Sequence, residues 1–220
     1  MKPGTTTKAR AFTLIELLVI IAVLLFLAAA LMPATSGPRK SSTALCMSHQ
    51  KQIALAIAMW SSDHNDKFPW RFSTNNDGTA EYISSGDAAL HFHAVTNYLK
   101  GAPFIFHCPT DRERAPAATQ TSLDDTNLSY FAAMDVGATA SSSLLTGDRH
   151  LAGDGKPVKP GLFLYSTNLL INWTHELHES SSATRGVLSF ADGHVEPSPG
   201  NHLNSTFRNE QLATNRLAVP

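Results

Sequence analysis

One long apolar run near the start of the chain constrains the fold more than any other feature. Residues 11–32 read AFTLIELLVIIAVLLFLAAALM, and Glu16 is the only charged residue among these 22. As a helix, which rises about 1.5 Å per residue, the run would match the ~30 Å hydrocarbon core of a bilayer. A carboxylate inside such a segment costs roughly 2.5–3.5 kcal/mol on insertion scales. The sequence therefore predicts a membrane-spanning helix whose single acid has a function and a partner.

Two ordinary membrane signals explain this run less well. A secretory signal has an apolar region of about 7–15 residues, which is shorter than the run observed here. A plain signal anchor fits the length, and Lys2, Lys8 and Arg10 would hold the preceding leader in the cytoplasm. Neither signal explains a carboxylate in the first turns of the run.

The start of the run resembles the cleavage and N-methylation signal of type IV prepilins and type II secretion pseudopilins. Residues 11–17, AFTLIEL, carry the resemblance, and Ala11 stands where the family usually has Gly. The resemblance implies that a prepilin peptidase cuts between Ala11 and Phe12 and methylates the new amine of Phe12. It also implies that this ammonium pairs with Glu16 on a neighbouring subunit during assembly.

The apolar run is followed by a second helical pattern. Pro33 lies 21 positions after Phe12, where pilin-like helices commonly carry a proline that removes one backbone hydrogen bond and bends the axis. We expect the helix to continue past it, weakened but unbroken. Its second half should bury a stripe at spacings of three and four residues, made of Leu45, His49, Ile53, Ile57 and Trp60. Turn-forming residues 61–66 should end it.

The pattern divides the chain into four parts. They are a cleaved basic leader (1–11), a transmembrane and filament-core helix (12–33), an amphipathic continuation of the stem (34–66) and a globular α+β domain (67–220). In the last part we expect a short helix, several strands, a hairpin around an Asp-Gly turn, and loops at 74–79, 115–127 and 150–160. The expected helix is 88–99; the expected strands are 104–107, 128–133, 143–146, 161–165, 185–190 and 194–196. The predicted fold is α+β and pilin-like, with a long N-terminal helix packed on a small antiparallel sheet.

Segments throughout the globular part resemble landmarks of a bacterial pseudopilin subgroup. They are residues 47–56, 60–69, 106–111 (F-x-C-P-x-D), 129–131, 145–149, 190–194 (FADGH) and 215–220. In that subgroup a histidine usually precedes the Asp of the D-G motif by ten residues. Here position 182 is Ser, and His178 lies four residues further upstream. The loop before the D-G motif is therefore longer than in the subgroup.

The chain has two cysteines, Cys46 and Cys108, in the part that should face an oxidising compartment. They allow one intramolecular pairing, which would tie the stem helix to the globular domain. Closing so long a loop contributes roughly 4 kcal/mol on the chain-entropy model. Two buried free thiols are the alternative. Neither cysteine belongs to a C-x-x-C pair, which argues against zinc.

The other candidate sites carry weaker signals. His175 and His178 are spaced to share one helix face, yet no metal-binding frame surrounds the ten histidines, and surface or packing roles are expected. Major pseudopilins of type II secretion hold Ca²⁺ in a C-terminal loop, and 148–154 or 124–125 would supply carboxylates. The spacing is not that of an EF-hand, and aspartates are common in turns. We expect no cofactor and assign no metal ligands, with Ca²⁺ as the alternative.

Composition and motifs exclude two classes of function. Without the leader, 14 Lys and Arg face 18 Asp and Glu, so no basic patch remains to bind nucleic acid. The sequence contains no Gly-x-Ser-x-Gly elbow and no phosphate-binding loop, so we expect no enzyme and no catalytic residues.

The resemblance implies a structural subunit, a pseudopilin of a type II secretion-like periplasmic filament. Its partners would be other pseudopilin subunits, the prepilin peptidase and an inner-membrane secretion assembly platform. The protein would cross the inner membrane once, with its C-terminal domain periplasmic, and then enter the filament. Two alternatives stay open at this point. One is a type IV pilin of a surface fibre; the other is a membrane-anchored periplasmic module whose loops at 111–127 and 147–160 bind a glycan or a partner protein.

Overall fold

The computed structural model describes residues 13–30, 38–135, 143–174, 177–178, 185–209 and 214–220. The chain divides into two compact units, 1–37 and 38–220. The proline expected to kink the stem, Pro33, lies outside the described residues, as does the junction between the two helical halves.

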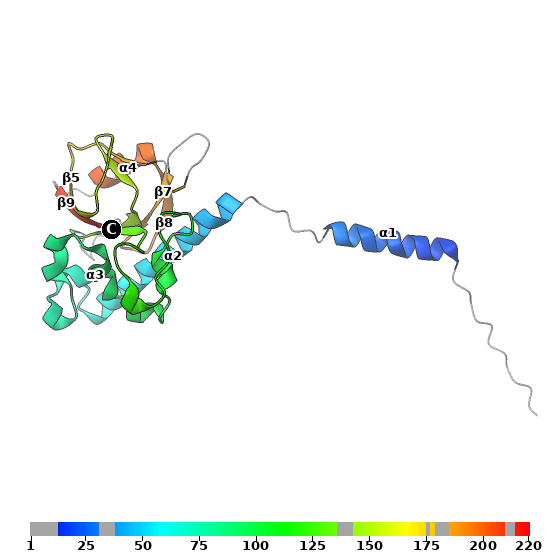
Figure 1. Cartoon of the computed structure of the whole chain (residues 1–220), viewed down its shortest axis with the longest axis horizontal. Helices are drawn as coiled ribbons and strands as arrows, with labels where there is room; N and C mark the ends of the chain where they lie inside the picture. Colours follow the sequence, from blue (N-terminus) through cyan, green and yellow to red (C-terminus); the bar gives the residue numbers. More distant parts are fainter. Residues whose placement is uncertain (1–12, 31–37, 136–142, 175–176, 179–184, 210–213) are drawn as a thin grey trace, which may run out of the picture. The chain divides into compact units, whose positions relative to one another are not determined.

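The first unit contains helix α1 (Leu14–Ala30) (Figure 1). Its large apolar side chains are exposed on every side, with exposed fractions between 44% at Ile20 and 77% at Leu14. A helix that is apolar all round needs a lipid or protein environment to cover it. Within the described part of the chain, no helix combines the length and the hydropathy that crossing a membrane requires.

The second unit begins with helix α2 (Pro38–Asp63), which ends within the predicted turn region. Its buried face is formed by Cys46, Gln50, Ile53, Ile57 and Trp60, again at spacings of three and four residues. Leu45 was predicted on this face but is 46% exposed. The buried face therefore begins at Cys46, where the side chain is covalently joined to the domain.

The main sheet has six strands in the order β5-β9-β1-β2-β7-β8, and every described pair is antiparallel. The antiparallel α+β class predicted from the sequence is thus confirmed, as is the β7–β8 hairpin around Asp192-Gly193. The strands are β1 (Tyr130–Ala133), β2 (Leu144–Asp148), β5 (Gly161–Ser166), β7 (Arg185–Phe190), β8 (Val195–Pro199) and β9 (Thr214–Val219).

Register gives the two faces of this sheet different chemistry. Thr146 pairs with Ser189 across β2 and β7, so both lie on the face with Asp148, toward α2. Gly147 pairs with Phe131 and Leu188 on the opposite face. There Phe131 packs near Phe207 of helix α4 (Gly200–Asn209). The buried polar side chains Thr146, Asp148 and Ser189 therefore point toward the stem helix.

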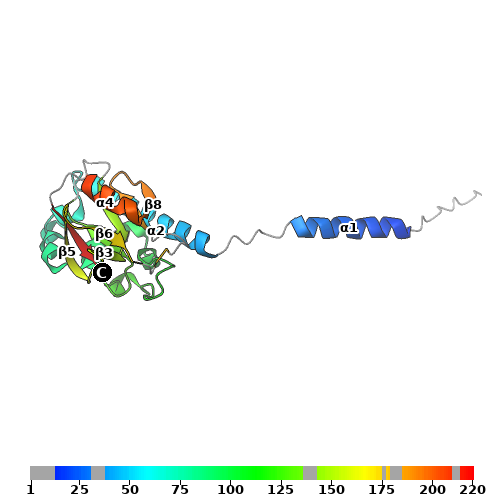
Figure 2. The same cartoon turned by 90° about the horizontal axis from the view of Figure 1, so that it is seen from above.

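Smaller elements surround the sheet (Figures 1 and 2). A three-stranded sheet runs in the order β4-β3-β6, and Figure 2 shows α4 beside β8. Its strands are β3 (Leu151–Gly153), β4 (Lys156–Pro157) and β6 (Ile171–Trp173). The short helices are η1 (Pro69–Arg71), η2 (Thr74–Asn76), η3 (Ala80–Ser85), α3 (Ala88–His93), η4 (Thr96–Leu99), η5 (Pro103–Phe106) and η6 (Gln120–Ser122).

Three local predictions were wrong in this region. Residues 104–107 form the 3₁₀ helix η5 instead of a strand, because Pro103 starts a tight turn that buries Ile105 and Phe106. The expected loop 150–160 contains β3 and β4. The single helix expected over 88–99 is two, α3 and η4, and Asp87 caps α3 by accepting a hydrogen bond from the Leu90 N–H.

Candidate functional site

A buried carboxylate joins α2 to the sheet. Asp148, at the end of β2, has no exposed area. Its Oδ1 accepts a 3.1 Å hydrogen bond from Gln50 Nε2, and its Oδ2 accepts one of 2.7 Å from the Val187 N–H. His178 Nε2 lies 3.1 Å from the same Oδ2. A buried charge needs several such partners to be tolerated, so this carboxylate fixes the position of the helix on the sheet.

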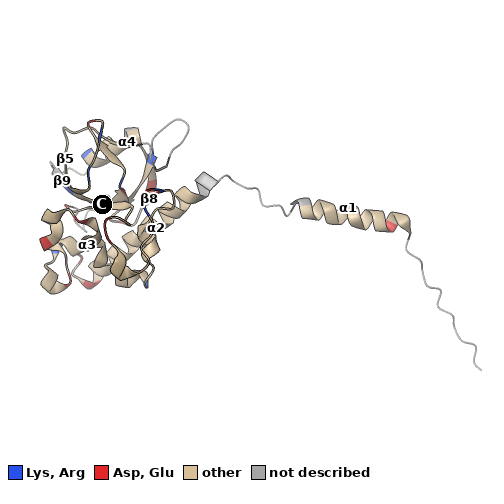
Figure 3. Cartoon of the chain, in the orientation of Figure 1, with Lys and Arg blue, Asp and Glu red and all other residues tan. Residues whose placement is uncertain are grey.

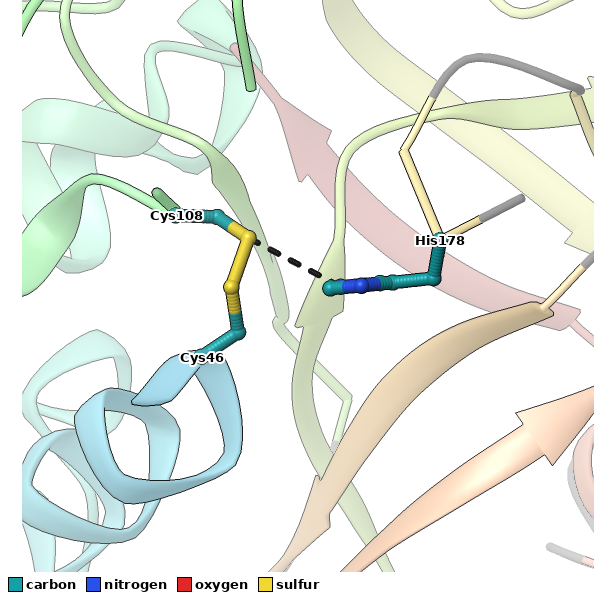
Figure 4. Close-up of side chains that lie close together, drawn as sticks. All are labelled: Cys46, Cys108 and His178. Carbon is teal, nitrogen blue, oxygen red and sulfur yellow. Dashed lines mark hydrogen bonds between the residues drawn. A yellow bond between two sulfur atoms is a disulfide. The ribbon is translucent and has the colours of Figure 1, made fainter. Parts of the chain in front are cut away.

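The disulfide lies directly beside this carboxylate. Cys46 on α2 is bonded to Cys108, which follows η5, and both sulfurs are buried (Figure 4). The dashed line in Figure 4 joins Cys108 Sγ to His178 Nε2, 3.6 Å away. The other ring nitrogen of His178 lies 3.1 Å from Thr43 Oγ1. One histidine thus contacts both the covalent and the polar link between α2 and the domain.

A second buried acid follows the Cys-Pro segment. Asp111 accepts two hydrogen bonds from Arg149, of 2.8 and 3.0 Å, and one of 2.8 Å from Ser129 Oγ. Burial raises the pKa of Asp111, but the hydrogen bonds and charge of Arg149 outweigh it and hold the pKa below its usual value. Arg149 also pairs with Glu113, so its guanidinium occupies the space between these acids. This arrangement is an ion-pair network that anchors the segment after Cys108.

The aspartates considered for calcium have structural roles. Asp148 is buried among the partners described above, and Asp154 Oδ1 accepts a hydrogen bond from the Leu170 N–H. Asp124 Oδ1 accepts one from the Thr126 N–H, and Asp125 Oδ1 accepts one from the Ala89 N–H. The bond of Asp124 is the local one that turns commonly make, whereas those of Asp154 and Asp125 join residues 16 and 36 positions apart. Calcium binding stays an untested prediction, and His175 of the predicted histidine pair lies outside the described residues.

An open cleft of about 570 Å³ lies at the C-terminal end of α2. Tyr98 is fixed there by a 2.7 Å hydrogen bond to Asp63. The side chains of Asp77, Tyr82 and Asn97 make no hydrogen bond to another described residue. Among the described residues, the lining contains no Lys or Arg; it consists of Trp60, His64, Thr74, Asp77, Gly78, Thr79, Tyr82, Leu90, His93, Ala94, Asn97 and Tyr98.

The start of α1 holds the acid that the sequence singled out. Thr13 and Glu16 form a capping box, because Glu16 Oε2 accepts hydrogen bonds of 2.9 Å from both the N–H and the hydroxyl of Thr13. The Glu16 N–H in turn donates to Thr13 Oγ1 over 3.3 Å. Glu16 is the acid of the first turn of α1, and Figure 3 shows red near the start of this helix. The carboxylate is therefore held at the helix N-terminus, next to the predicted cleavage site.

Comparison with protein families finds a known motif at the start of this helix. Residues 6–32 carry a prokaryotic N-terminal methylation motif. The methylation motif covers the end of the leader, the predicted cleavage site and all of α1. No curated protein and no solved structure matches the chain.

The methylation motif is consistent with the type IV prepilin-like and pseudopilin family and supports a pilin-like or pseudopilin subunit. It implies processing by a prepilin peptidase and assembly with other pilin subunits. Proteins with this motif are structural subunits. The processing residues Ala11 and Phe12 lie outside the described residues, so the cut between them stays a prediction.

Sequence reasoning missed the residues that join α2 to the domain. Gln50 lies in the landmark segment 47–56 but was given no role, and its bond to Asp148 spans 98 residues. Asp148 and Arg149 were noted as part of a landmark, without a role. The available signal was polarity after an apolar start, since T-G-D follows two leucines in a strand whose residues are all buried. For His178, the signal was its position, four residues upstream of the place where the subgroup usually has a histidine.

Proposed function

We propose that this protein is a pseudopilin, a structural subunit of a type II secretion-like filament that assembles through α1. One observation supports the proposal above the others: the methylation motif ends in an apolar helix whose only acid lies in its first turn. The protein would be stored in the inner membrane by this helix, with residues after the stem in the periplasm. Cleavage between Ala11 and Phe12 would create the amine that Glu16 requires.

Assembly has a simple physical basis. The exposed apolar surface of α1 can leave lipid only if helices of neighbouring subunits cover it. In the filament, the ammonium of Phe12 would pair with Glu16 of the next subunit, which offsets most of the cost of burying a carboxylate. Because extraction of an apolar helix from lipid is uphill, an assembly platform in the inner membrane must supply energy. The disulfide suits the oxidising compartment on the far side of that membrane.

The capping box allows a test that separates charge from helix capping. Glu16→Gln keeps a side chain that can cap the helix, because Glu and Gln both complete a capping box, but it removes the charge. Thr13→Val removes the cap and keeps the charge. We expect Glu16→Gln to be cleaved and membrane-bound yet poorly incorporated into filaments, and Thr13→Val to assemble nearly normally. Normal incorporation of Glu16→Gln, measured by filament shearing and immunoblotting, would contradict the pairing role.

A type IV pilin of a surface fibre is the closest alternative, since the methylation motif serves both classes. The two differ in where the filament ends. Immunogold labelling of intact cells distinguishes them, because a pseudopilin filament stays within the envelope and a pilus extends from the surface. Labelled surface fibres at native expression would favour the pilin.

A membrane-anchored binding module is a second candidate function, favoured by the cleft at the end of α2. Its unpaired side chains and aromatic lining are typical of sites for small polar ligands. The cleft differs from the loops proposed from the sequence, since the cavity beside 149–160 is only about 110 Å³. This function predicts that a fragment from Pro38 onward binds glycans and that Tyr82→Ala abolishes binding. The exposed Phe104→Ala, outside the cleft, is the matched control.

A further inference from the structure

Three side chains from distant parts of the chain meet at the disulfide with the composition of a zinc site. They are Cys46 on α2, Cys108 after η5, and His178 between β6 and β7. Their two sulfurs and one imidazole nitrogen all lie within 4.8 Å of one another, and all three residues are buried. Such a set escapes detection by sequence spacing, because Cys46 and Cys108 are 62 positions apart.

The distances fit tetrahedral coordination closely. Zn–S bonds of about 2.3 Å and Zn–N bonds of about 2.0–2.1 Å place sulfur and nitrogen ligands roughly 3.5 Å apart. Cys108 Sγ and His178 Nε2 are already 3.6 Å apart. The two sulfurs would have to separate, to roughly 3.8 Å, once the bond between them is broken.

Neighbouring groups surround such a site. Asp148 Oδ2, held by the Val187 N–H, lies 3.1 Å from His178 Nε2 but does not belong to the cluster of three, so a water takes the fourth position. Imidazole and thiolate are ordinary zinc ligands. With Nε2 on the metal, the Nδ1–H of His178 can donate to Thr43 Oγ1, which lies 3.1 Å away and would fix the ring.

We propose that, in the reduced chain, Cys46, Cys108 and His178 bind one Zn²⁺ in place of the disulfide. A dithiol reductant breaks the S–S bond, is itself oxidised to a cyclic disulfide, and leaves two thiols. Binding of Zn²⁺ then releases the two thiol protons to solvent and forms two Zn–S bonds. Because the disulfide is fully buried, this state belongs to chains that fold before oxidation. The disulfide and the zinc site would each join α2 to the segment after η5 and so close the same loop.

The test uses the full chain in detergent micelles, unfolded, reduced with a dithiol and refolded without oxygen in the presence of Zn²⁺ or Co²⁺. We expect one metal ion per chain, and the Co²⁺ form should show thiolate-to-cobalt charge transfer with a tetrahedral spectrum. His178→Ala should bind at least about 10-fold more weakly. The matched control His91→Asn, which changes a buried histidine outside the cluster, should bind like the wild type. Oxidised chain should bind no metal at this site.

Three results would overturn the proposal. They are less than about a tenth of an ion per reduced chain, equal affinity of His178→Ala and the wild type, and failure of the reduced chain to refold with Zn²⁺. The variant's own folding is checked in its oxidised form, where the disulfide holds the loop closed without His178. A weakened site in a chain whose oxidised form is native therefore reports on metal binding.

Discussion

The acid stability of the globular unit should depend on one buried histidine. His91 on α3 is 1% exposed, and its Nδ1 lies 2.8 Å from Thr79 Oγ1. Burial lowers the pKa of His91 to about 4, against the opposing charge of Asp87. The unfolded chain takes up this proton near pH 6.5, whereas the folded chain resists it until about pH 4.

The sign and size of the effect follow from that difference. Between pH 6.5 and 4 the unfolded state binds one more proton than the folded state, so stability falls as the pH falls. Each pH unit costs about 1.4 kcal/mol, which sums to roughly 3 kcal/mol over the window. Asp125 acts in the opposite direction, because burial raises its pKa to about 6 and its folded form keeps a proton that the unfolded form has lost. The wild-type profile alone is therefore ambiguous.

Substitution separates the two groups. His91→Asn retains an atom that can bond Thr79 but cannot titrate, so its free energy of unfolding should not carry the loss of roughly 3 kcal/mol between pH 7 and 4. Asp125→Asn should instead remove a gain of stability over about pH 6 to 4. Urea unfolding of a fragment starting at Pro38, which forms its own compact unit, measures both profiles. A difference between wild type and His91→Asn that is constant with pH would refute the reasoning.

Other predictions concern the links within the globular unit. Arg149→Ala should cost about 3–5 kcal/mol in urea unfolding, because it leaves the buried Asp111 without its counter-ion; the exposed Arg112→Ala should cost no more than about 0.5 kcal/mol. Gly186→Ala should destabilise by about 1–3 kcal/mol, because the new Cβ would lie 2.6 Å from the Trp173 ring; wild-type stability would contradict this packing. Reducing the disulfide with a chelator present should lower the free energy of unfolding by roughly 4 kcal/mol, and an unchanged urea midpoint would contradict the stabilising role of the disulfide.

Local patterns predicted some elements well, for physical reasons. α1 is an apolar run with a single charge, Glu16, and the β7–β8 hairpin is set by an Asp-Gly turn between two short strands. The strand predicted over 104–107 was wrong. Phe and Ile favour strands, but the preceding Pro103 and the burial of Phe106 favour a tight helical turn. Tertiary packing overrode propensity there.

Long-range pairing lies beyond such patterns. β9 was noted as a motif but not as a strand, although it lies inside the sheet between β5 and β1. Helix α4 was missed, although its buried residues Leu203 and Phe207 are four positions apart and so lie on one helix face. The bond from Gln50 to Asp148 and the contact of His178 with the disulfide depend on the folded chain, so no local window of sequence contains them.

The N-terminus of the assembled protein tests the central claim most directly. Mass spectrometry of the protein from sheared filaments or envelope fractions should find N-methyl-phenylalanine at Phe12 as its first residue. Detection of the peptide joining Arg10 to Phe12 in the assembled protein would mean that the leader is retained. In that case Glu16 would have no new ammonium to pair with, and the proposed route of assembly would be wrong.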